Sequence, residues 1–162
     1  MAKVELKAPV VQEISELLNG ATAAVLVDYR GITVEKDTQL RKELRQNGVT
    51  YRVYKNTLLN IAMKGTPFEK LSGDLNGPTA IAVTKADATA PARVITNFDK
   101  KGETIQLKAG VVDGTYYDQK GINAVALIPS REILLGRLLG SMKAPITNFA
   151  RVLKQMAEKM EA

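Results

Sequence analysis

Residues 23–31, with the sequence AAVLVDYRG, contain the first strongly apolar run of this 162-residue chain. The run is short and partly β-branched, and the polar turn DYRG follows it, which is the pattern of a buried strand that ends at a loop. Apolar residues also recur at helical spacing over residues 8–18, where Asn19 and Gly20 then stop the pattern. The start of the chain therefore predicts an amphipathic helix followed by a core strand.

The same alternation of helices and strands continues to about residue 130. Further strands are predicted at residues 49–54, 79–84 and 104–111, and further helices at residues 34–46, 56–63, 88–98 and 118–127. Thr33 is expected to cap the second helix, and residues 72–78 are expected to form a loop. The order of elements predicts an α+β fold, a two-layer α/β sandwich with a ferredoxin-like mixed sheet, over residues 1–130.

The composition excludes several kinds of catalytic and metal site. The chain has no cysteine and no histidine, which rules out disulfides, thiolate metal sites, cysteine nucleophiles and serine–histidine triads. Neither a G-x-x-x-x-G-K-[ST] nor a G-x-G-x-x-G motif is present. We therefore expect a protein that is not an enzyme and has no cofactor or metal ion.

The charge balance favours an anionic partner. Lys and Arg number 23 against 17 Asp and Glu, which gives a net charge of +6 and favours nucleic acid, a membrane surface or an acidic protein as partner. No segment has the roughly 20 apolar residues that a membrane-spanning helix needs, and no export signal is recognisable. We expect a cytoplasmic protein without a membrane partner.

A different pattern begins after Pro129 and Ser130. Apolar residues recur there at alternating intervals of four and three, which places them in one stripe along a helix. We call this stripe the seam, and it consists of Leu135, Leu139, Met142, Ile146, Phe149, Leu153, Met156 and Met160. The seam predicts a long C-terminal helix within a separate domain over residues 131–162.

Length and charge indicate that another molecule covers the seam. A helix over residues 133–160 spans roughly 42 Å, whereas a globule of 130 residues is about 36 Å across. Five basic residues and one acidic residue lie between Arg137 and Lys159, so we expect an acidic partner. Pro145 is expected to kink the helix or to divide it, with Ser141 capping the second segment. Packing of the helix on its own domain remains the alternative.

Residues 41–64 contain six basic residues and one acidic residue. Arg41 and Arg45 share one helix face, Arg52 lies on a predicted strand, and the helix start at Lys55 offers backbone N–H groups to a phosphate. Tyrosines suited to stacking on bases are close in sequence: Tyr29, Tyr51 and Tyr54. The stretch predicts an RNA-binding surface, with a solvated charged face as the alternative.

Several motifs, ordered along the chain, carry a family resemblance. They are VLVDYRGIT at 25–33, LRKELR at 40–45, VYKNTLL at 53–59, GPTA at 77–80, LIPSRE at 127–132 and API at 144–146. Together they resemble the bacterial stalk-base proteins of the large ribosomal subunit, the ribosomal protein L-ten family. The resemblance covers nearly the whole chain.

The resemblance implies a non-catalytic ribosomal protein with two binding surfaces. Its N-terminal domain is expected to bind the GTPase-associated region of large-subunit rRNA beside a neighbouring stalk-base ribosomal protein. Its C-terminal helix is expected to carry dimers of an acidic stalk protein, two rather than three, which recruit translational GTPases.

The site residues follow from the motifs and from charge. The motifs assign to RNA binding Tyr29, Arg30, Gly31, Lys55, Asn56 and Thr57, and the charge pattern adds Arg41, Arg45 and Arg52. The resemblance assigns to the partner face Leu135, Leu139, Met142, Ile146, Phe149, Leu153 and Met156.

Alternatives remain open at this point. Gly31 has the alternative role of supplying a positive φ, and Thr57 that of capping a helix. The whole chain has two alternative functions: a small phosphate-handling α/β enzyme that uses the helix start at Lys55, or a basic adaptor whose C-terminal helix forms a coiled coil with a second copy.

Overall fold

The computed structural model describes residues 8–99 and 105–160. The chain divides into two units, which we call the head (Met1–Ile128) and the tail (Pro129–Ala162). Residue 104, the predicted first residue of the fourth strand, lies outside the described residues.

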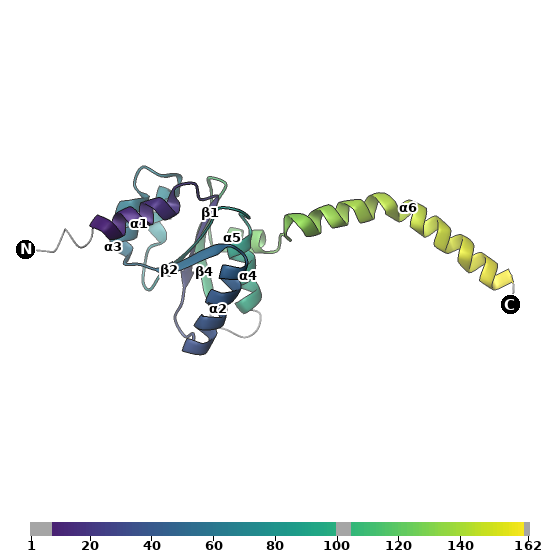
Figure 1. Ribbon diagram of the computed structural model, residues 1–162, viewed down its shortest axis with the longest axis horizontal. Coiled ribbons are helices and arrows are strands. Elements are labelled where there is room, and N and C mark those ends of the chain that lie inside the picture. The colour runs from purple at the N-terminus through teal and green to yellow at the C-terminus, as the bar shows by residue number, and fades with distance from the viewer. Residues whose placement is uncertain (1–7, 100–104, 161–162) are drawn as a thin grey trace, which may run out of the picture. The chain divides into compact units, whose positions relative to one another are not determined.

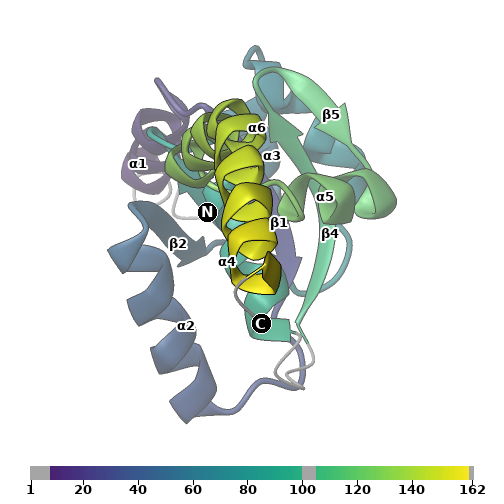
Figure 2. The same cartoon turned by 90° about the vertical axis from the view of Figure 1, so that its right-hand side faces the viewer.

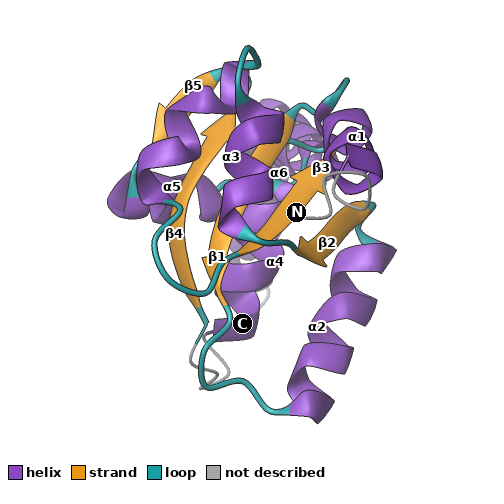
Figure 3. Cartoon of the chain, turned by 90° about the vertical axis from the view of Figure 1, so that its left-hand side faces the viewer, coloured by secondary structure: helices purple, strands orange, loops and turns teal. Residues whose placement is uncertain are grey.

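A five-stranded sheet runs through the head in the order β2-β3-β1-β4-β5 (Figure 3). Its strands are β1 (Ala23–Asp28), β2 (Val49–Val53), β3 (Ala80–Thr84), β4 (Gln106–Val112) and β5 (Thr115–Tyr117). The α+β class is confirmed, but the described sheet is antiparallel in every pairing rather than mixed. The reason is that β3 inserts between β1 and β2, so these two strands run in the same direction without being neighbours.

Helices cover both faces of the sheet, which Figures 2 and 3 show from opposite sides. One face packs against α1 (Ala8–Leu18), α3 (Asn56–Met63) and the 3-10 helix η1 (Pro67–Asp74). The other packs against α2 (Val34–Gln46), α4 (Ala90–Asp99) and α5 (Gln119–Ala126). The head therefore has three layers, and the expected two-layer arrangement is wrong.

Strand β1 explains the third layer. Val25 and Val27 belong to the core cluster under α2, α4 and α5, whereas Ala24 and Leu26 belong to the cluster under α1, α3 and η1. All six residues of β1 are buried. A continuous apolar run is typical of a strand that is covered on both faces, so the run that predicts β1 also carries the signal for two helical layers.

Strand β4 contains a β-bulge beside β1. Leu26 lies opposite Ala109, but Val27 lies opposite Leu107, so Lys108 is an extra residue in β4. The bulge breaks the regular alternation of the strand, and Leu107 and Ala109 consequently face different core clusters. Lys108 is left between them at the end of the sheet where β1 finishes.

Two local predictions need correction. Thr33 precedes α2 as expected, but its side chain makes no capping hydrogen bond. Residues 67–74 form η1, which overlaps the predicted loop at residues 72–78. Strand β5, which the sequence does not predict, follows a turn in which Asp113 has a φ of 49°.

The tail consists of one helix, α6 (Arg131–Met160). Pro145 is the fifteenth of its thirty residues, and Figure 1 shows that α6 bends near its middle. The expected kink is therefore present, whereas a division into two helices is not. Proline removes one hydrogen bond and crowds the preceding turn, which bends the helix without ending it.

Candidate functional site

One end of the sheet brings together segments that are far apart in sequence. Val27 pairs with Ala80 of β3 and Leu107 of β4, and Ala80 also pairs with Val53 of β2. The residues that follow β1 and β2 therefore meet the residues that precede β3. These are residues 29–31, 55–57 and 75–79, so three of the sequence motifs come together at this end.

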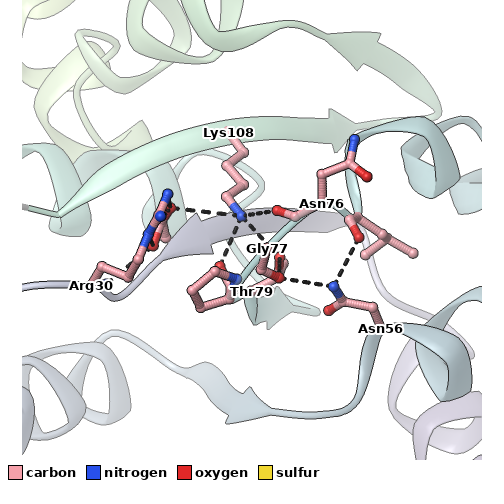
Figure 4. A network of polar contacts seen from close by, with 9 residues as sticks. Arg30, Asn56, Asn76, Gly77, Thr79 and Lys108 are labelled. Carbon is pink, nitrogen blue, oxygen red and sulfur yellow. Dashed lines mark hydrogen bonds and ion pairs between the residues drawn. The ribbon is translucent and has the colours of Figure 1, made fainter.

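Lys108 occupies the centre of a polar network at this end of the sheet (Figure 4). Its Nζ donates hydrogen bonds to the backbone oxygens of Asn76 (2.6 Å) and Pro78 (2.8 Å) and to Oγ1 of Thr79 (3.0 Å). It also lies 3.8 Å from Oδ2 of Asp28. The Lys108 side chain is only 17% exposed. Its ammonium group therefore binds other groups of the protein and is largely shielded from solvent.

Asp28 fixes the position of Arg30. Its carboxylate accepts hydrogen bonds from Nη2 of Arg30 at 2.7 Å, from Nε at 3.1 Å and from the backbone N–H at 3.1 Å. The hydrogen bonds from Arg30 lower the pKa of Asp28, against the effect of burial, and the charge of Lys108 lowers it further. Asp28 is therefore ionised at neutral pH. The Arg30 side chain remains 71% exposed.

Gly31 completes this turn. Its φ is 84°, which lies in the left-handed region that glycine adopts at little cost. The backbone conformation alone therefore accounts for a glycine here, and an RNA contact of Gly31 remains a prediction.

Asn56 connects the start of α3 to the same loop. Its Nδ2 donates hydrogen bonds to the backbone oxygens of Leu75 and Gly77, both at 2.8 Å. Lys55 occupies the position before α3 and is exposed, as is Thr57. The capping alternative for Thr57 is wrong, because the cap position belongs to Lys55 and no side-chain capping bond forms there.

A second basic group lies at the outer edge of the sheet. Arg41, Arg45 and Arg52 line a hollow of about 220 Å³ beside the edge strand β2. Nε of Arg41 donates to Oδ2 of Asp37 at 2.7 Å, and Arg52 pairs with Glu13 of α1 at 2.8 Å. The arginines that the sequence singles out by charge are thus brought together, and we call Arg41, Arg45 and Arg52 the arginine edge.

The tyrosines are less available for stacking than the sequence suggests. Tyr51 is buried beneath Arg41, whose guanidinium lies 5.0 Å from the ring centre, and burial raises the pKa of Tyr51 to about 12. The hydroxyl of Tyr54 donates to Glu13 at 3.2 Å. Tyr29 is half-buried against the core. Tyr51 is poorly placed for stacking, because alternation along β2 turns most of its side chain into the core.

The seam of α6 is exposed along its length. The seven predicted partner residues, Leu135 to Met156, have exposed fractions between 50% and 75%. Six basic and two acidic residues give α6 a net charge of +4. The helix thus presents a continuous apolar stripe on a positively charged rod.

The described residues meet neither the requirements of a metal site nor those of a membrane-spanning helix. Within residues 8–99 and 105–160, no three Asp, Glu, His or Cys side chains lie close enough to share a metal ion. Of the helices that the structure describes, none is both long and apolar enough to span a bilayer.

Comparison with known families decides which kind of protein carries these surfaces. The family described as ribosomal protein L10 matches residues 2–100, and that described as ribosomal protein uL10 C-terminal region matches residues 128–162. The chain belongs to the ribosomal protein L10 family. The resemblance seen in the sequence motifs is confirmed.

Relatives of this L10-family protein match nearly its whole length, and each is named large ribosomal subunit protein uL10. The relative from Clostridioides difficile (strain 630) is 46% identical over 159 residues, which is 98% of this chain and 95% of the relative. That from Syntrophotalea carbinolica is 48% identical over 151 residues, 93% and 88% of the two chains. That from Bacillus cereus (strain B4264) is 43% identical over 162 residues, which is 99% of this chain and 98% of the relative.

Family membership settles the class of function. L10-family proteins are structural proteins of the large ribosomal subunit, so this chain is a ribosomal protein and not an enzyme. The alternative of a phosphate-handling enzyme built on Lys55 is therefore wrong.

The sequence did not single out the two residues at the centre of the L10-family head network. Asp28 and Lys108 are not among the predicted site residues, although both carry a signal. Each is a charged residue at or within a mostly apolar strand: Asp28 ends β1, and Lys108 lies between Leu107 and Ala109. Their partners are 2 to 80 residues away in sequence, so spacing alone does not reveal them.

Proposed function

We propose that this protein forms the base of the stalk of the large ribosomal subunit. In this proposal the head binds the GTPase-associated region of large-subunit rRNA, beside a neighbouring stalk-base protein. The helix α6 carries dimers of an acidic stalk protein, which recruit translational GTPases in the cytoplasm. The exposed seam of α6 carries the proposal, because an apolar stripe of this length in water needs a partner.

The RNA side of the proposal rests on two groups of the head. Arg30 offers an exposed guanidinium at the end of the sheet where α3 also begins with Lys55, Asn56 and Thr57. The arginine edge adds three planar cationic groups around one hollow. Guanidinium groups and helix N-termini are the usual ligands of phosphate oxygens, so both groups suit an RNA backbone.

The arginines of the head are held by carboxylates but remain accessible. Arg30, Arg41 and Arg52 pair with Asp28, Asp37 and Glu13, while their side chains are 71%, 42% and 54% exposed. The pairs of Arg41 and Arg52 are partly exposed on both sides, and such pairs contribute roughly 0–1 kcal/mol. A phosphate can therefore approach these guanidinium groups at small cost.

The tail side rests on the shape and charge of α6. Pro145 separates a first part of the seam, Leu135, Leu139 and Met142, from a second part that begins at Ile146. The helix has fourteen residues before Pro145 and fifteen after it, and two parts of similar length favour two acidic dimers over three. The net charge of +4 favours an acidic partner and opposes a coiled coil of α6 with a second copy.

Capture experiments with the full chain test both sides. Replacing Leu139 and Leu153 by Lys adds two positive charges but places them in the seam, so capture of the purified acidic stalk protein is expected to be lost. The control Glu158→Lys adds the same charge on the opposite face of α6 and is expected to bind at least as well as the unchanged chain. Equal capture by both variants would contradict the role of the seam.

The RNA side is tested in parallel with a fragment of the GTPase-associated region. Binding to the head is expected to weaken steeply with salt, because phosphate contacts release counterions, and to be unchanged by both tail variants. A flat salt response would count against the arginine edge and Arg30. Sedimentation at micromolar concentration checks the alternative of self-association, which a concentration-dependent dimer of the isolated chain would support.

A further inference from the structure

We infer that Lys108 and Asp28 are positioning residues of the RNA-binding end of the head. They hold Arg30 and the loop at residues 75–79 in one arrangement without contacting RNA themselves. The inference rests on the proposed rRNA binding and assigns roles to two residues that the sequence motifs leave without one.

The first observation is that Lys108 has no donor left for a phosphate. A lysine ammonium has three N–H bonds, and Nζ of Lys108 already donates to the three oxygens of Asn76, Pro78 and Thr79 at 2.6 to 3.0 Å. The side chain is also largely shielded from solvent. A cation in this state stabilises its surroundings and is poorly suited to capture a ligand.

The second observation is the position of Lys108 in the sheet. The β-bulge in β4 inserts Lys108 beside the end of β1, and its ammonium bonds the loop that leads into β3, on the far side of β1 in the sheet. Figure 4 shows the side chain bridging these strands. Bulges are found where a strand must redirect one side chain, and here the redirected side chain joins two segments separated by about 30 residues.

The third observation concerns the carbonyl oxygens of the loop. Those of Leu75 and Gly77 accept hydrogen bonds from Asn56, and those of Asn76 and Pro78 accept from Lys108. Four consecutive carbonyl oxygens are therefore occupied by donors from the protein. Free carbonyl oxygens repel a phosphate, so this occupation leaves the end of the sheet favourable to an anion, with Arg30 exposed next to it.

Asp28 completes the arrangement from the other side. It lies between the ammonium of Lys108 and the guanidinium of Arg30, and it bonds both the backbone and the side chain of Arg30. A single carboxylate thus fixes the turn and the orientation of the arginine. Preorganising a side chain in this way lowers the entropy lost when it binds a ligand.

The variant Asp28→Asn separates positioning from charge. It removes one negative charge next to Arg30, so simple electrostatics predicts tighter RNA binding. If Asp28 positions Arg30, the full-length variant instead binds the rRNA fragment more weakly, by about tenfold. The control Asp113→Asn makes the same change in charge at the opposite end of β4 and is expected to leave affinity unchanged or slightly higher. Tighter binding by Asp28→Asn would overturn the inference.

Lys108→Met gives a second test through the salt dependence. The variant keeps the length of the side chain but loses its three hydrogen bonds, so affinity is expected to fall about tenfold. Because Lys108 does not contact phosphate, the slope of log affinity against log salt is expected to stay the same, whereas Arg30→Ala should reduce it by about one. A slope reduced in Lys108→Met would show a direct phosphate contact and contradict the inference.

Thermal unfolding of each variant, followed by circular dichroism, keeps the two tests interpretable. Affinities are compared at a temperature where every variant is folded. If Lys108→Met does not fold, the direction of the change in RNA affinity of Asp28→Asn still tests the inference. Failure of the unchanged chain to bind the rRNA fragment would instead refute the proposed function, which is a different outcome from either result above.

Discussion

The head and the tail use the same apolar side chains for different purposes. Leu26 of the head is fully buried, whereas Leu139 of the tail is 58% exposed. In the head, strand alternation between two helical layers places each apolar residue in one of two core clusters. The described residues of the tail form a single helix, so within that unit its seam has no second layer to pack against. An apolar pattern thus predicts a helix or strand. The neighbours of that element determine whether its apolar side chains stabilise the fold or remain exposed for binding.

The largest expected contrast is between Leu26→Ala and Leu139→Ala. Leu26→Ala removes fully buried methyl groups in the central strand and is expected to lower the free energy of unfolding of the head by about 3 kcal/mol. Leu139→Ala removes exposed methyl groups and is expected to change it by less than about 0.5 kcal/mol. Urea unfolding of both variants makes the comparison, and a large loss in Leu139→Ala would mean that the seam belongs to a core.

Substitution by alanine at two glycines is expected to change stability by smaller amounts and in opposite directions. A Cβ on Gly110 of β4 would lie 2.8 Å from Cδ1 of Ile122 and 3.2 Å from Cγ2 of Val25, so Gly110→Ala is expected to destabilise the head by about 1–2 kcal/mol. A Cβ on Gly136 of α6 meets nothing within 4 Å. Gly136→Ala is expected to stabilise α6 by up to about 1 kcal/mol.

Thermal unfolding of the head and helical circular dichroism of the full chain measure these two effects. Equal destabilisation by both glycine variants would show that the tail packs as tightly as the head.

The smallest expected effect is the response of the head to acid. Burial alone would raise the pKa of Asp87, but hydrogen bonds from Thr89 and the charge of Arg93 outweigh it and lower the pKa. The pKa of Asp28 is lowered as well. Because both values lie below those of the unfolded chain, the stabilisation is complete above about pH 5 and is lost as the pH falls through the folded-state values.

The variant Asp87→Asn isolates part of this effect. It is expected to cost the head about 0.5–1 kcal/mol at pH 7 and to unfold with a weaker dependence on pH below 4. Unfolding measured between pH 2 and pH 7 gives both quantities. An unchanged pH dependence would mean that Asp87 has the same pKa in the folded and unfolded states.

Much of the fold follows from local patterns. The run at residues 23–28 predicts β1, the helical spacing predicts α1, and the alternating intervals of the seam predict α6. Each of these signals comes from neighbours within about seven residues, where geometry fixes which side chains share a face. The kink at Pro145 is predictable for the same reason.

Features that depend on distant neighbours were not predicted. The third layer, the antiparallel placement of β3 and the burial of Tyr51 all depend on which element packs on which face. The role of Lys108 depends on a bulge and on oxygens about 30 residues away. In the candidate site, charge and motifs identify Arg30 and the arginine edge, while the residues that hold them become visible only in the structure.

Amide hydrogen exchange of the full chain, alone and with the acidic stalk protein, tests the central claim most directly. In the chain alone we predict slow exchange in the buried strands β1 and β3 and fast exchange throughout α6, because an isolated helix of this length is marginal in water. With the acidic protein, exchange is expected to slow in α6 and to stay the same in the head. Slow exchange of α6 in the chain alone, equal to that of β1, would contradict the account.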